Sequence, residues 1–191
     1  MNKKQRVEYL KAAVFSEDWN VAQDACGKLF HFGGRFNKTK RKKHRQFLIQ
    51  LLDQEKPRAR NAAALTFRLN RYSAAVIPLL HAITKPENSK NRGTLVYALE
   101  KLKCHHHLGD LFSVLFGATG NWEVQNHTLR VLEEQIFEFT REEVQKVAKD
   151  WNVIRDNWNI LNSIDEKHIS QLDFDRKLIQ SFVDDYLVYL Q

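Results

Sequence analysis

The chain has 191 residues, of which 43% are hydrophobic and 28% charged, a composition typical of globular proteins that excludes an intrinsically disordered chain. The formal net charge is +7, but the first 103 residues hold 22 Lys and Arg against 8 Asp and Glu (net +14), whereas the last 88 hold 8 against 15 (net −7). No secretory signal and no run of about 18 apolar residues is present, so we expect a cytoplasmic protein.

Hydrophobic residues recur with helical spacing along almost the whole chain. Apolar stripes of this kind occupy residues 47–52, 76–83, 108–116 and 178–190, and strict two-residue alternation is not sustained over any strand-length window. Pro (3) and Gly (7) are scarce, which favours long helices joined by short turns. The sequence therefore predicts an all-α protein of about ten helices.

Three segments carry the same pattern for the start of a helix, namely residues 18–21, 121–124 and 150–153. Each begins with Asp or Asn followed by Trp, so we expect the first residue to cap the helix and the Trp to pack against its first turn. Thr140 with Glu143, and Ser163 with Glu166, have the spacing of capping boxes.

These helix starts recur at regular intervals when two further ones, at 57–60 and 88–92, are included. Aligning Val21, Ala59, Asn91, Val124 and Val153 gives spacings of 38, 32, 33 and 29 residues. Such periods are typical of stacked helical hairpins. Two alternatives are a tetratricopeptide array, whose fixed Trp, Gly, Tyr and Pro offsets we do not find, and a helical bundle with accidental periodicity.

The best repeats resemble the HEAT family. Residues 53–65 resemble the acidic–Pro turn and Ala-rich inner helix of that motif, and residues 73–83 resemble its outer helix with an early proline. The match is best over 53–135, and Asn91 and Gly93-Thr94 depart from it. The resemblance implies a right-handed α-solenoid of about five HEAT-like hairpins, forming a single domain over 1–191 with atypical capping helices at both ends.

In such a solenoid the inner helices line a concave face, which predicts an outward stripe of side chains. The positions expected to project are Arg60, Ala64, Arg68 and Arg71, then Arg92, Val96, Glu100 and Lys103, then Gln125, Leu129, Glu133 and Ile136. The stripe runs from basic to acidic along the chain. The alternative is that these residues form ordinary solvated helix faces.

The strongest local signal is the basic segment 35–45, in which seven of eleven residues are Lys or Arg. It lies at the start of a predicted helix, where the macrodipole disfavours cations, so a polyanionic partner or mere solubility must explain the charge. The residues predicted to bind this partner are Arg35, Lys38, Lys40, Arg41, Lys42, Lys43, Arg45, Arg60, Arg68, Arg71 and Arg92.

Signals for catalysis are weak. Cys104 and His105–His107 are residue types that bind zinc, but adjacent residues on one turn cannot all converge on one ion, so we expect no metal and no cofactor. Some bacterial alkylpurine DNA glycosylases are built from HEAT-like repeats and use Trp and Asp against the damaged base. Trp19, Trp122, Trp151 and Trp158, with Asp150 or Asp156, superficially resemble those ingredients.

These observations favour a non-enzymatic binding or scaffold module. Its basic N-terminal half is expected to meet an acidic protein partner, and its acidic C-terminal half a second partner or the basic end of another copy, head to tail. The alternative is a nucleic-acid-binding protein that uses the basic surface. A HEAT-like glycosylase is the third and weakest hypothesis.

Overall fold

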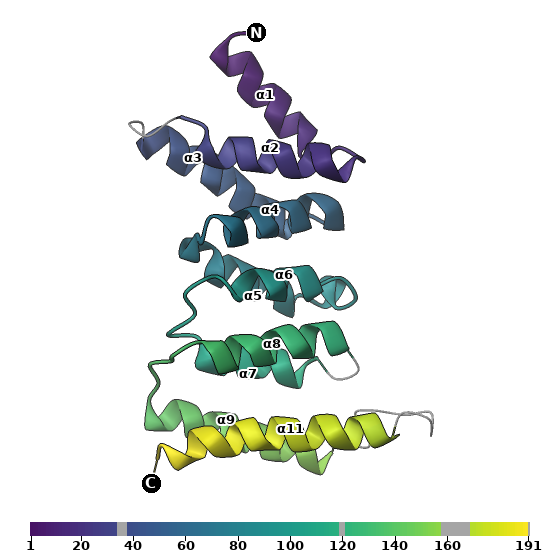
Figure 1. The fold of residues 1–191 in the computed structure, drawn as a ribbon, viewed down its shortest axis with the longest axis vertical. Coiled ribbons are helices and arrows are strands. Elements are labelled where there is room, and N and C mark those ends of the chain that lie inside the picture. The colour runs from purple at the N-terminus through teal and green to yellow at the C-terminus, as the bar shows by residue number, and fades with distance from the viewer. Residues whose placement is uncertain (34–37, 119–120, 158–168, 191) are drawn as a thin grey trace. The chain divides into compact units, whose positions relative to one another are not determined.

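A computed structural model describes residues 1–33, 38–118, 121–157 and 169–190, with side chains from residue 173 onward in the last range. Ten α-helices and three short 3₁₀ helices lie in these ranges, which contain no strand, so the predicted all-α class is confirmed (Figure 1). The α-helices are α1 (Lys3–Ala13), α2 (Trp19–His31), α3 (Lys38–Gln50), α4 (Pro57–Leu69), α5 (Val76–Thr84), α6 (Gly93–Leu99), α7 (Leu108–Phe116), α8 (Trp122–Glu134), α9 (Arg141–Asp156) and α11 (Ile169–Val188). The 3₁₀ helices are η1 (Leu51–Asp53), η2 (Ser73–Ala75) and η3 (Pro86–Asn88).

The chain divides into two compact units, residues 1–103 (unit 1) and 104–191 (unit 2). The boundary falls at the position where the charge changes sign, so unit 1 carries a net charge of +14 and unit 2 a net charge of −7. The asymmetry seen in the sequence is therefore a difference between two structural bodies.

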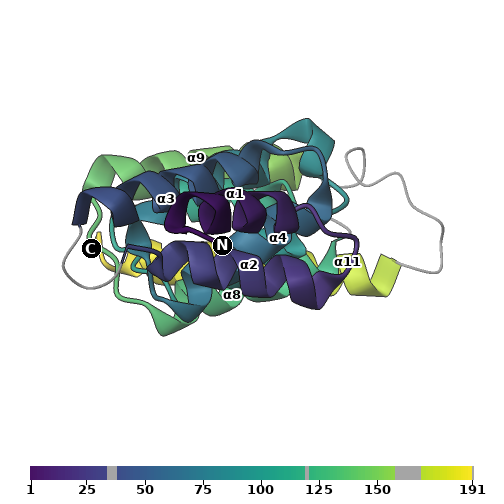
Figure 2. The ribbon, with the colours of Figure 1, turned by 90° about the horizontal axis from the view of Figure 1, so that it is seen from above.

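Unit 1 is built by helices that pack mainly on their neighbours in the sequence. α2 packs on α4, and α4 packs on α6, while α1 packs on α2. These helices follow one another down unit 1 in Figure 1, and the view from above shows α2 and α3 side by side (Figure 2). Ala59, Ala62 and Ala63 are fully buried in α4. Their small side chains let the neighbouring helices α2 and α6 approach α4 closely.

Unit 2 packs around aromatic rings. α7 contacts both α8 and α9, and α11 packs on α9. The Tyr186 ring meets those of Phe112, Phe137 and Phe139 edge to face, with centroids 5.5–6.4 Å apart. Such rings bury a large apolar area and also gain from their edge-to-face geometry.

The caps show which predicted helix starts are real. The Asp18 carboxylate accepts from the backbone N–H groups of Asn20 and Val21, and the Asn121 side chain accepts from that of Val124, so both predicted caps are confirmed. Thr140 caps α9 through the backbone N–H of Glu143. The predicted start at 150–153 is wrong, because α9 begins at Arg141 and ends at Asp156, so these residues lie inside it. The 163–166 box lies outside the described residues.

The tryptophans do not share one packing role. Trp19 and Trp122 stand at the first position of α2 and α8, but 39% and 70% of their surface is exposed. Trp151 is fully buried, stacks on Phe116 with ring centroids 5.5 Å apart, and donates from Nε1 to Gln180 Oε1 at 2.7 Å. Trp151 is therefore a core residue, whereas Trp19 and Trp122 remain exposed at the starts of their helices.

None of the helices described here combines the length and the apolar character that a membrane crossing requires.

The cap assignment can be tested within unit 2. Asn121→Ala should lower the free energy of unfolding by about 1 kcal/mol, because the first turn of α8 loses its side-chain acceptor. Asp150→Ala should cost less than about 0.5 kcal/mol, since it removes only an exposed ion pair with Lys146 inside α9. Urea denaturation of the two variants measures both values, and equal losses would contradict the boundaries of α9.

Candidate functional site

The basic segment lies at the N-terminal end of α3, and its lysines are directed to solvent. Arg35 lies outside the described residues. Lys38, Lys42 and Lys43 are exposed and form no ion pair with any described residue, and the first turn of α3 holds no acidic side chain. Of these three lysines, Lys38 stands in the first turn, where the helix dipole opposes a cation.

Arg45 belongs to the same segment but has a structural role. Its guanidinium lies 4.0 Å from the ring centroid of Phe30 and 4.9 Å from that of Tyr72. Its Nε lies 3.5 Å from the Phe30 carbonyl oxygen. These contacts join α3 to the end of α2 and to the turn after α4, so Arg45 packs within unit 1 instead of facing a partner.

His44, the residue before this arginine, is buried. Its ring meets that of Phe32 edge to face at 5.3 Å. Burial lowers the pKa of His44 below its ordinary value of 6.5, and the positive charges of Lys11, Lys43 and Lys40 lower it further, against a smaller opposing effect of Glu8. The folded protein therefore favours the neutral imidazole.

Arg60 is the clearest correction to the predicted binding stripe. Only 2% of its surface is exposed. Its guanidinium donates to the Asn88 side-chain oxygen and, at 3.2 Å, to the Asn91 carbonyl oxygen, and Asn88 in turn donates to the Ala82 carbonyl oxygen. Burial lowers the pKa of the Arg60 guanidinium. Arg60 points to the next turn of unit 1 because α4 is packed between α2 and α6.

Arg68 also serves the packing of α4 on α6. Its guanidinium lies 3.7 Å from the Tyr97 ring centroid, donates to the Tyr97 carbonyl oxygen at 3.2 Å, and pairs with Glu100 at 3.2 Å. Arg92 is half-buried directly before α6, and desolvation lowers its pKa. Arg71 remains exposed, in a left-handed turn conformation with φ of 47°.

The rest of the expected stripe is also mostly covered. Of its apolar and uncharged members, Ala64, Val96 and Gln125 are buried. Lys103, Glu133 and Ile136 are exposed. The positions predicted from the 32-residue offset therefore do not form one continuous exposed face within either unit. Among the described residues predicted to bind the partner, the exposed ones other than Arg71 lie on α3, at Lys38, Lys40, Lys42 and Lys43.

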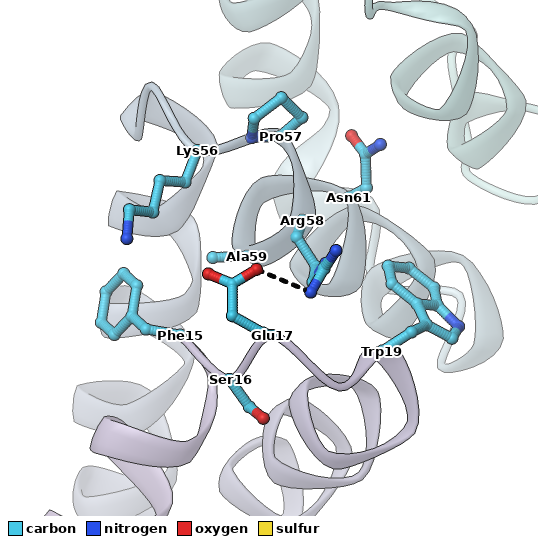
Figure 3. Close-up of a pocket in the computed structure, with 9 residues that line it drawn as sticks. All are labelled: Phe15, Ser16, Glu17, Trp19, Lys56, Pro57, Arg58, Ala59 and Asn61. Atoms are coloured by element: carbon cyan, nitrogen blue, oxygen red, sulfur yellow. Dashed lines mark hydrogen bonds and ion pairs between the residues drawn. The ribbon is translucent and has the colours of Figure 1, made fainter.

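A cleft of about 500 Å³ opens where two helix-connecting segments of unit 1 meet (Figure 3). One segment is the α1–α2 connection, and the other is the η1–α4 connection with the first turn of α4. We call this hollow the turn cleft; its walls are formed by Phe15, Ser16, Glu17, Trp19, Lys56, Pro57, Arg58, Ala59 and Asn61. Across it, Arg58 Nη1 lies 2.9 Å from Glu17 Oε2.

The residues with metal-binding side chains at 104–107 diverge. Cys104 is buried, and burial raises the pKa of its thiol to about 12. The Nδ1 atoms of His105 and His107 lie 2.8 Å from the Ile136 carbonyl oxygen and 2.9 Å from Asp110 Oδ2. Within the described part of the chain, no three His, Cys, Asp or Glu side chains are grouped to hold a metal ion.

The residues considered for base recognition are also dispersed. Trp151 is buried in the core of unit 2 and cannot stack on a base. Trp158 lies outside the described residues, and Trp19 belongs to unit 1. Comparison with protein-family models, curated proteins and solved structures gave no match.

Sequence reasoning missed the turn cleft, although a signal for it exists. The 38-residue spacing between Val21 and Ala59 places the starts of α2 and α4 at equivalent repeat positions. In a stacked array equivalent positions become neighbours, so the aromatic residues around the start of α2 should meet the cations around the start of α4. That juxtaposition is the one the structure shows.

The environment of His44 predicts a pH dependence of stability. Because its pKa is lowered on folding, the unfolded chain binds the proton more tightly, and stability falls as the pH drops below about 6.5 toward the lower folded value. This slope cannot exceed about 1.4 kcal/mol per pH unit for one proton. The unfolding free energy of wild type minus that of His44→Gln should therefore decrease between pH 6.5 and 5, and a pH-independent difference would contradict the prediction.

Proposed function

We propose that this chain is a non-enzymatic binding module whose basic unit 1 docks an acidic protein partner. The observation that carries the proposal is the coincidence of charge and structure: the +14 of the sequence is gathered on one compact body. A field of this size attracts polyanions and speeds their encounter with the protein.

The exposed lysines of α3 form the proposed docking surface. Lys38, Lys42 and Lys43 face solvent, whereas Arg45, Arg60 and Arg68 are engaged inside unit 1. Lysines on flexible stems suit a partner of diffuse negative charge, because they adapt to it without a fixed geometry. An acidic segment of a protein has this character.

We further propose that the helices form a HEAT-like α-solenoid. The sequential packing of α2, α4 and α6 supports this, as does the repeat spacing of their starting residues. Pro57 opens α4, as expected for the turn and inner helix of that motif. Buried alanines on the same helix also fit the resemblance.

Charge reversal on α3 tests the docking surface. Fluorescence anisotropy with a labelled 12-residue polyglutamate peptide should show binding to the full chain at low salt, weakening as salt rises. Lys42→Glu/Lys43→Glu should weaken binding about tenfold or more, because both side chains are exposed cations of the surface.

The matched control is Lys3→Glu/Lys4→Glu, which changes the charge of unit 1 equally at the exposed start of α1. It should weaken binding by no more than about threefold. Equal losses in both variants, or no binding of wild type at low salt, would contradict the proposal. Tighter binding of generic duplex DNA, lost in the α3 variant, would establish the nucleic-acid alternative instead.

A further inference from the structure

Two aromatic side chains of unit 1 remain exposed beside the turn cleft. Phe15 and Trp19 are each 39% exposed. Trp19 makes no ring contact with another described aromatic residue, in contrast to Trp151, which stacks on Phe116 in the core of unit 2. The fold therefore does not account for Trp19 as a core residue.

We propose that the turn cleft binds an aromatic side chain carried by an acidic peptide segment of the partner. The inference rests on the proposed function, and it adds a source of specificity to the diffuse attraction of the α3 lysines. Trp and Arg dominate the energetic centres of protein interfaces, and both border this cleft at Trp19 and Arg58. Its volume of about 500 Å³ lies in the range of sites that enclose a small ligand or large side chains.

Charge complementarity identifies the peptide as acidic. Lys56 and Arg58 both line the cleft, and the unit around them carries a net charge of +14. The Arg58–Glu17 pair is exposed on both sides, with 43% and 85% of the side-chain surface accessible. Exposed pairs of this kind stabilise a protein little, so Arg58 can exchange Glu17 for a carboxylate of the partner at small cost.

The arrangement of the rings favours a peptide over a nucleic acid. Figure 3 shows Phe15 and Trp19 on opposite sides of the Glu17–Arg58 pair, so they do not form a continuous platform for successive stacked bases. The Glu17 carboxylate would repel a sugar–phosphate backbone. In contrast, it can accept a hydrogen bond from a peptide N–H group.

Two labelled probes separate aromatic recognition from charge attraction. Both are 12-residue polyglutamate peptides, one with a single central Phe and the other with Ala at that position. The full chain should bind the Phe peptide about tenfold more tightly than the Ala peptide, because one buried aromatic anchor contributes that much. Trp19→Ala should remove this preference and leave the affinity for the Ala peptide unchanged.

The matched control is Trp122→Ala, which removes another exposed Trp from the first position of a helix, outside the turn cleft. It should keep the preference. Phe15→Ala removes the aromatic ring on the other side of the cleft. It should reduce the preference for the Phe peptide by about threefold or more. This second variant decides the question if Trp19→Ala is poorly folded by circular dichroism.

The outcomes distinguish this inference from the proposed function. If wild type binds both peptides equally, or if Trp19→Ala and Phe15→Ala keep the preference, the turn cleft is not the aromatic site, although the proposed function stands. If wild type binds neither peptide at low salt, both proposals fail. If a 12-nucleotide oligothymidylate binds more tightly than the Phe peptide and depends on Trp19, the occupant is a nucleic acid and the inference is wrong.

Discussion

The packing of α4 between α2 and α6 is the constraint from which the other features of unit 1 follow. Side chains of α4 that face α2 or α6 are removed from water. A long polar side chain at such a position therefore needs hydrogen-bond or ionic partners. Arg60 is buried and Arg68 is half-buried, and their partners lie in the 88–91 turn and at α6 respectively. A planar guanidinium with several donors can satisfy such neighbouring groups at once, which a single ammonium cannot do as well.

Most of the cations predicted to bind a partner fall into two groups. Arg45, Arg60 and Arg68 contact neighbouring helices and turns of unit 1, so their guanidinium groups are engaged inside this unit. Lysines at the start of α3 remain in water. The binding that we propose therefore depends on the exposed lysines of α3 and on the positive net charge of unit 1. The packed helices of unit 1 hold these lysines in place.

The sequence predicted the helical class, the charge division and several helix starts, because these depend on local periodicity and capping. Asp18, Asn121 and Thr140 each cap the helix expected of them. The pattern at 150–153 misled because the same Asp-Trp pair can occur inside a helix when the Trp is needed in the core, as Trp151 is. Local pattern alone does not distinguish the two.

The candidate sites were harder to predict, since they depend on which face of each helix is covered. Assigning Arg60 to an exposed stripe required the direction of its side chain, and this is set by the neighbouring layer. The turn cleft combines two connections about 40 residues apart, which only the stacking of unit 1 brings together.

The claim that Arg60 and Arg68 stabilise the packing of α4 can be tested most directly in the variant Arg60→Lys/Arg68→Lys, which preserves the charge of unit 1. Chemical denaturation should show a loss of about 2 kcal/mol or more in the free energy of unfolding. The reason is that lysine cannot replace the several hydrogen bonds of each guanidinium, nor its planar contact with the Tyr97 ring at position 68. Unchanged stability would contradict the account, since it would mean that these arginines do not hold the layers of unit 1 together.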